Sequence, residues 1–102
     1  MSDLSDFINT RYQELLNKPQ FVYVLACAQD KYYVGYSTKL HERLVRHFAG
    51  RGAVFTKRYK PQSVLMYRSV LSKTEEFEVF LKFVQVFGED NVGGFNLDYN
   101  CI

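Results

Sequence analysis

The sequence contains few residues that cross-link or interrupt a chain. Its 102 residues include two cysteines, two prolines and no tryptophan. Two cysteines, at positions 27 and 101, are too few for a disulfide framework or a cysteine-based metal cluster, so we expect two reduced thiols. The longest uncharged apolar run, residues 21–28, is much shorter than the roughly 20 residues that span a bilayer. With no signal-like segment at the start, these features predict an intracellular protein, cytoplasmic or nuclear, without membrane contact.

The chain is instead rich in apolar and aromatic residues. Hydrophobic residues make up 47% of it, including 8 tyrosines and 9 phenylalanines, which favours a packed core over disorder. The length predicts a single domain over residues 1–102. Lysine and arginine total 13 against 11 acidic residues, and the net charge is +2. Any nucleic-acid surface would therefore have to be local.

Two β-rich runs predict a hairpin in the first half of the chain. Residues 21–27 form the first run and residues 32–36 the second, with a turn at Gln29 and Asp30 between them. A third strand is predicted over residues 63–71. The expected sheet is small, three-stranded and mainly antiparallel.

Apolar residues at helical spacing predict helices around this sheet. The first covers about residues 3–17, the second ends near Gly50, and the third covers residues 74–87. The tail, residues 89–102, has turn chemistry with scattered apolar residues, and we expect it to be irregular but packed. Together these elements predict an α/β (α+β) fold with an extra N-terminal helix.

Five residues of this region form a recognisable pattern. The triplet Phe-Val-Tyr ends at Tyr23, and the triplet Tyr-Val-Gly runs from Tyr33 to Gly35, so ten residues separate the two tyrosines. The following helix carries Arg43 and His47, four residues apart at one border of its apolar stripe. Because that spacing is about one helical turn, the two side chains can point at a common spot beside the core.

This order of strand, turn, strand and R-x-x-x-H helix resembles the small stand-alone catalytic domain of the GIY-YIG nucleases, over about residues 21–88. The resemblance implies a DNA endonuclease of repair or recombination type that hydrolyses phosphodiester bonds with Mg²⁺ (or Mn²⁺). It also implies that Tyr23 acts as a general base or base relay and that Tyr33 lies at the phosphate. Arg43 would bind the scissile phosphate, and His47 would transfer or orient a proton.

The metal ligand is the main departure from the family pattern. The family places a glutamate on the helix after the third strand, and that position falls here at about Phe80. Helical geometry puts Glu76 on the apolar border of the helix, whereas Glu75 and Glu78 lie on its polar side. We therefore expect Glu76 to bind the metal, after a helix shift of roughly one turn, about 5 Å. The alternatives are loss of metal binding, a first-turn Glu76 that only complements the helix dipole, or ligands from the tail: Glu89, Asp90, Asn91 and Asp98.

The segment after this helix carries the candidate DNA-binding residues. Its cations alternate with Phe55 and Tyr59, a composition suited to tracking a phosphate backbone and stacking a base. Gly35 matches the family glycine, and its bare backbone would allow substrate or Arg43 to approach. The predicted DNA-contacting cations are Arg51, Lys57, Arg58 and Lys60.

Two other functions stay open. A nuclease fold without a metal ligand could bind nucleic acid without cutting it. The surplus phenylalanines of the last helix could instead form a protein-interaction surface, for a homodimer or another partner. Dimerisation together with DNA binding would still agree with a nuclease.

Overall fold

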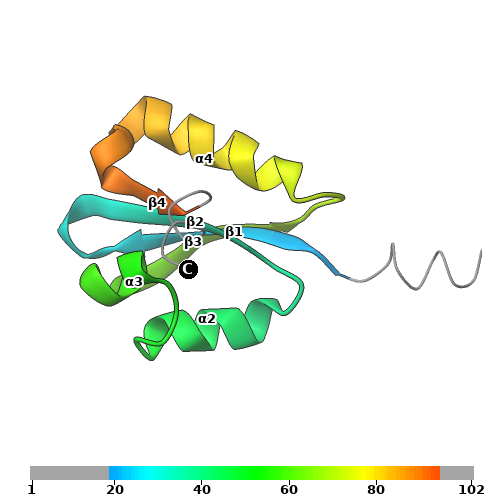
Figure 1. Ribbon diagram of the computed structural model, residues 1–102, viewed down its shortest axis with the longest axis horizontal. Coiled ribbons are helices and arrows are strands. Elements are labelled where there is room, and N and C mark those ends of the chain that lie inside the picture. The colour runs from blue at the N-terminus through cyan, green and yellow to red at the C-terminus, as the bar shows by residue number, and fades with distance from the viewer. Residues whose placement is uncertain (1–18, 95–102) are drawn as a thin grey trace, which may run out of the picture.

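The computed structural model describes residues 19–94, which form a four-stranded sheet flanked by helices (Figure 1). The strand order is β3-β1-β2-β4. Strands β1 (Phe21–Cys27), β2 (Lys31–Ser37) and β3 (Pro61–Ser69) are antiparallel neighbours, with β1 in the centre. The short β4 (Val92–Gly94) pairs with β2 in parallel. The predicted α+β fold and its three antiparallel strands are confirmed, and the sheet gains a fourth strand.

The β1–β2 hairpin turns through a short 3-10 segment, η1 (Ala28–Asp30). Gln29 and Asp30 have positive φ angles of 62° and 58°, in the left-handed region that lets two strands reverse tightly. The predicted turn residues are thus the observed ones. The resulting register places Tyr23 directly opposite Gly35.

Helices cover both faces of the sheet (Figure 1). Helices α2 (Leu40–Phe48) and α3 (Val54–Arg58) lie on one face, and α4 (Thr74–Phe87) lies on the other. A second 3-10 segment, η2 (Glu89–Asn91), leads from α4 into β4. Helix α3 was not predicted, because the sequence between positions 51 and 60 has the composition of a basic loop.

Strand alternation divides the core into two clusters. Valines of β1 and β2 face α4, with Val79, Phe80 and Phe83 packed against them. Tyr23 and Tyr33 point to the opposite face, where Leu40, Leu44 and Phe55 of α2 and α3 cover them. Because Leu25 pairs with Tyr33 and successive side chains of a strand point in opposite directions, Tyr23 and Tyr33 share one face.

The prediction of an irregular tail was wrong at residues 92–94, which form β4. Glycine is disfavoured in strands, so sequence pattern gave no strand signal there. Tertiary packing requires a glycine at position 93, because a Cβ there would overlap the ring of Phe55. The predicted N-terminal helix and the second cysteine lie outside the described residues.

Two further expectations can be compared with the described residues. Cys27 is buried and free, and burial raises the pKa of its thiol to about 11, so it is an unreactive core residue. Among residues 19–94, no helix is both long enough and apolar enough to cross a membrane.

Candidate active site

Tyr23 is held in place by its strand neighbour. It is the third residue of β1, 1% exposed, and lies opposite Gly35 in β2. A Cβ at position 35 would overlap the phenol ring and hydroxyl of Tyr23, so only glycine leaves room for this side chain. The Tyr23 phenol thus fills the space that the missing side chain of Gly35 leaves, and the expected approach of substrate or Arg43 at this glycine stays a prediction.

Tyr23 is hydrogen bonded to His47 inside the protein. The Tyr23 hydroxyl lies 2.7 Å from Nε2 of His47, which projects from the last turn of α2. The other ring nitrogen, Nδ1, lies 2.9 Å from Oγ1 of Thr56 in α3. Side chains from a strand and two helices thus form one buried chain of polar contacts.

His47 is neutral at physiological pH. Its side chain is 1% exposed, and a Cβ at Gly52 would overlap the imidazole at Nδ1, so the backbone closes over the ring. The pKa of His47 is lowered from 6.5 to about 4, mainly by burial and in addition by the positive charges of Arg43 and Arg46. A neutral imidazole has one donor and one acceptor nitrogen, so Nε2 can accept the Tyr23 hydrogen.

Tyr33 completes an aromatic group around the histidine. It is 4% exposed, and its ring centroid lies 4.9 Å from that of His47 and 6.3 Å from that of Tyr23. Phe55 packs behind it, with ring centroids 6.0 Å apart. The structure thus brings Tyr23, Tyr33 and His47 together, and it uses Phe55 as a core residue of this cluster.

Arg43 lies one turn before His47 on α2 and is exposed. Its charge is close enough to lower the pKa of His47, and a site shared by the two residues stays a prediction. They differ in depth, because His47 enters the core and Arg43 stays at the surface. The other predicted cations are all exposed on α3 or beside it, on the same layer: Arg51, Lys57, Arg58 and Lys60.

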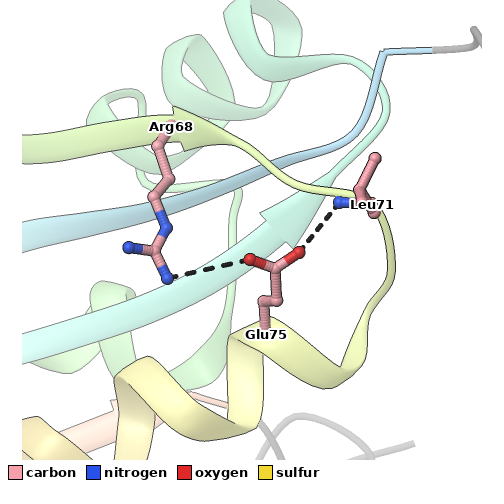
Figure 2. A network of polar contacts seen from close by, with 3 residues as sticks. All are labelled: Arg68, Leu71 and Glu75. Carbon is pink, nitrogen blue, oxygen red and sulfur yellow. Dashed lines mark hydrogen bonds and ion pairs between the residues drawn. The ribbon is translucent and has the colours of Figure 1, made fainter.

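The glutamates of α4 have different roles. Glu75 accepts the backbone N–H of Leu71 at 2.8 Å and lies 3.9 Å from the Arg68 guanidinium, so it ties the start of α4 to β3 (Figure 2). Glu78 is exposed. Glu76 is 5% exposed, in line with its predicted place on the apolar border of the helix.

A metal shared by Glu76 and the Tyr23–His47 pair does not fit this arrangement. Mg²⁺ needs only one or two carboxylates when water and substrate phosphate complete its shell, so Glu76 has suitable chemistry. However, α4 covers the face of the sheet opposite to Tyr23 and His47. Within residues 19–94, no group of three or more histidine, cysteine, aspartate or glutamate residues could hold an ion. Phe80, at the usual glutamate position, packs against the core valines.

Sequence reasoning missed Thr56 and Gly52. Both lie in the segment that we interpreted through its cations, and nothing in their local pattern distinguishes them from ordinary loop residues. Their contacts with His47 exist because the loop after α2 and the following α3 pack against this side chain at the end of α2. Such a contact is visible only in three dimensions.

Comparison with known proteins agrees with the pattern of these residues. The family described as the GIY-YIG catalytic domain matches residues 19–83. A UPF0213 protein of Streptococcus pyogenes serotype M5 (strain Manfredo) is 42% identical over 59 residues, which is 58% of this chain and 64% of the relative. A UPF0213 protein of Streptococcus pyogenes serotype M1 is 41% identical over the same shares of both chains. The match thus covers less than two thirds of these relatives' length. No solved structure matches the chain. Since the family match covers more than half of the sequence, including both tyrosines, Arg43 and His47, the chain belongs to the GIY-YIG family.

Proposed function

We propose that this protein is a nuclease that hydrolyses phosphodiester bonds in DNA, with Tyr23 and His47 moving the proton of the attacking water. The observation that carries the proposal is the 2.7 Å contact between the Tyr23 hydroxyl and Nε2 of the buried, neutral His47. A phenol alone is a poor base, because its reference pKa is about 10. An acceptor nitrogen at hydrogen-bond distance gives the phenol's own proton a place to go.

The proposed step is balanced within this pair. A water oxygen attacks phosphorus while the water proton passes to the Tyr23 oxygen and the Tyr23 proton passes to Nε2 of His47. The bond from phosphorus to the leaving oxygen breaks, and that oxygen takes up a proton from solvent. His47 then releases its extra proton to solvent and becomes neutral again. Since Tyr23 and His47 are each 1% exposed, the step also requires that access to the phenol opens when DNA binds.

Arg43 is the proposed phosphate-binding group. Its guanidinium can present two parallel N–H donors to phosphate oxygens. A phosphate bound there would offset part of the positive charge that lowers the pKa of His47, so substrate would make the histidine a better base. The exposed cations of α3 and its flanks extend this surface along the DNA backbone.

The proposal includes a divalent cation, Mg²⁺ or Mn²⁺, because GIY-YIG nucleases generally use one. Glu76 is the candidate ligand, since Glu75 is tied to β3 and Glu78 is exposed. No part of the proton transfer above depends on the ion. We further propose selection by DNA structure, with a homodimer or protein partner as its source, because a net charge of +2 does not favour general DNA binding.

The test is cleavage of supercoiled plasmid and of a branched synthetic DNA, with Mg²⁺, Mn²⁺ or a chelator. Tyr23→Phe, Arg43→Ala and Glu76→Gln are compared with His41→Gln, a matched control at an exposed position of α2. We expect the wild type and His41→Gln to cut only with a divalent ion. We expect Tyr23→Phe and Arg43→Ala, once shown to be folded, to lose at least about 90% of the rate. The rate of Glu76→Gln decides whether Glu76 is needed for the use of the metal. Cleavage that survives Tyr23→Phe would contradict the proposed relay.

A second candidate function is DNA binding without cleavage. It is favoured by the position of Glu76, whose helix covers the face opposite to Tyr23. Under this alternative the wild type would shift the branched DNA in a gel but leave it intact with every metal. Arg43→Ala would weaken binding, whereas Tyr23→Phe would leave it unchanged.

A further inference from the structure

The buried polar chain continues from His47 to Thr56. Thr56 is 1% exposed, and its Oγ1 lies 2.9 Å from Nδ1 of His47 and 3.1 Å from the backbone oxygen of Ala53. A backbone carbonyl only accepts hydrogen bonds, so the Thr56 hydroxyl directs its single hydrogen to Ala53. Toward His47 the same oxygen can then only accept. This arrangement of the hydroxyl places the ring hydrogen of His47 on Nδ1.

The opposite tautomer is disfavoured by the same contacts. If Nδ1 lacked its hydrogen, the Thr56 hydroxyl would have to turn toward it. The oxygens of Thr56 and Ala53 would then face each other at 3.1 Å with no hydrogen between them, which is repulsive. The Ala53 oxygen also accepts the N–H of Lys57 at 3.0 Å, which its two lone pairs allow.

We propose that Thr56 is a positioning residue that holds His47 in the Nδ1–H tautomer and so keeps Nε2 free to accept the Tyr23 proton. The tautomer follows from the contacts above, whereas its catalytic consequence rests on the proposed function. With the hydrogen on Nε2, the histidine would be a donor toward Tyr23 and could not take up its proton.

A hydroxyl differs from a carboxylate in this position. The aspartate of a serine-protease triad fixes the histidine tautomer and also stabilises the imidazolium by its charge. Thr56 is uncharged, so it selects the tautomer and leaves the imidazole neutral. This agrees with the neutral state of the buried ring, which has exposed arginines rather than acids beside it. In this site the charge that favours proton uptake has to come from the bound phosphate.

The direct test is nitrogen NMR of the histidine side chains in the ¹⁵N-labelled full chain at about pH 7. The wild type is compared with Thr56→Val, which keeps the shape and removes the acceptor, and with Thr56→Ser, which restores it. We expect the wild type and Thr56→Ser to show Nδ1 of His47 protonated. We expect Thr56→Val to move the hydrogen wholly or partly to Nε2, with the exposed His41 unchanged in all three proteins.

Protonated Nε2 in the wild type would overturn the proposal, and so would a Thr56→Val spectrum identical to the wild type. If Thr56→Val does not fold, the wild-type spectrum alone decides the tautomer. A merely structural role for Thr56 would lower the melting temperature of the valine variant without moving the ring hydrogen.

Cleavage kinetics test the consequence separately. We expect Thr56→Val to lower kcat by at least about tenfold with KM within about twofold, and Thr56→Ser to stay within about threefold of the wild type. If the wild type cuts DNA and Thr56→Val cuts at the same rate, the positioning role is wrong. If the wild type cuts no DNA, the proposed function fails, and the tautomer is still decided by the spectrum.

Discussion

Acidification tests the buried, neutral state of His47 without any assumption about substrate. The pKa of this histidine is lowered from 6.5 to about 4, first by burial and then by Arg43 and Arg46. In the unfolded chain the group returns to a pKa of about 6.5. Below that pH the unfolded state binds a proton that the folded state does not take up until about pH 4. The folded state is therefore destabilised as pH falls from about 6.5 to about 4, and His47 has no effect on stability above this window.

The size of the effect follows from the shift. Each unit of pKa difference corresponds to about 1.4 kcal/mol, so a shift from 6.5 to about 4 gives about 3 kcal/mol when the pH has fallen below both values. Between about pH 7.5 and about pH 5, the expected loss from this group is about 2 kcal/mol. Domains of this size are stable by about 5–15 kcal/mol, so the loss is measurable.

The assay is urea unfolding, followed by circular dichroism, at several values between about pH 7.5 and about pH 5. Carboxylates also titrate at the acidic end, so the wild type is compared with His47→Gln, which lacks the titrating group. His41→Gln is the matched control, since His41 is exposed on the same helix. We expect the wild type and His41→Gln to lose about 2 kcal/mol more than His47→Gln over this range. Equal pH dependence in all three proteins would refute the buried neutral histidine.

Three substitutions, two of them with a control variant, test the surroundings of the site. Gly52→Ala places a methyl group on the buried imidazole and should abolish cleavage. The control, Gly50→Ala, meets no atom within 4 Å and should cost only about 1 kcal/mol of backbone strain. Cleavage activity per folded molecule distinguishes the two variants. Arg43→Ala should lower kcat by at least about tenfold while changing the free energy of unfolding by less than about 0.5 kcal/mol, and the exposed Lys82→Ala on the opposite layer should change neither. Glu75→Ala should lower stability by about 1–2 kcal/mol, because a backbone N–H loses its carboxylate acceptor, yet leave the rate per folded molecule unchanged; a large loss of rate would make Glu75 a metal ligand.

The hairpin shows how much of this site can be predicted from the sequence. The sequence predicts the two strands and the turn between them, whereas the observed register, with Leu25 opposite Tyr33 and Gly35 opposite Tyr23, is what puts the two tyrosines on one face. Helical spacing likewise placed Arg43 and His47 on one border of α2. It gave the direction of both side chains but not their depth, because depth depends on what packs over the helix.

What could not be predicted depends on contacts between distant segments. The closure over His47 comes from Gly52 and Thr56, in a segment whose cations dominate its composition. Strand β4 likewise exists because Phe55 packs on Gly93 and because β2 offers an edge, although its own residues have low strand propensity. At Gly52 and Gly93, a side chain would overlap the ring of His47 or Phe55, so packing between distant segments requires a glycine that local propensity disfavours.

The position of Glu76 limits how this residue could take part in a metal-assisted reaction. Glu76 is the third residue of α4 and so lies in its first turn, shortly after β3 ends at Ser69. Tyr23 is near the same end of the sheet, because it pairs with Tyr67 two residues before the end of β3. The two residues are thus separated by the thickness of the sheet rather than by its length. If Glu76 held a divalent ion, the ion would supply positive charge on the α4 side of the sheet, and Tyr23 and His47 would handle the proton on the other side. Mg²⁺-dependent cleavage that is lost in both Tyr23→Phe and Glu76→Gln would show that both residues are needed, whereas Mg²⁺-dependent cleavage that survives Glu76→Gln would require another ligand.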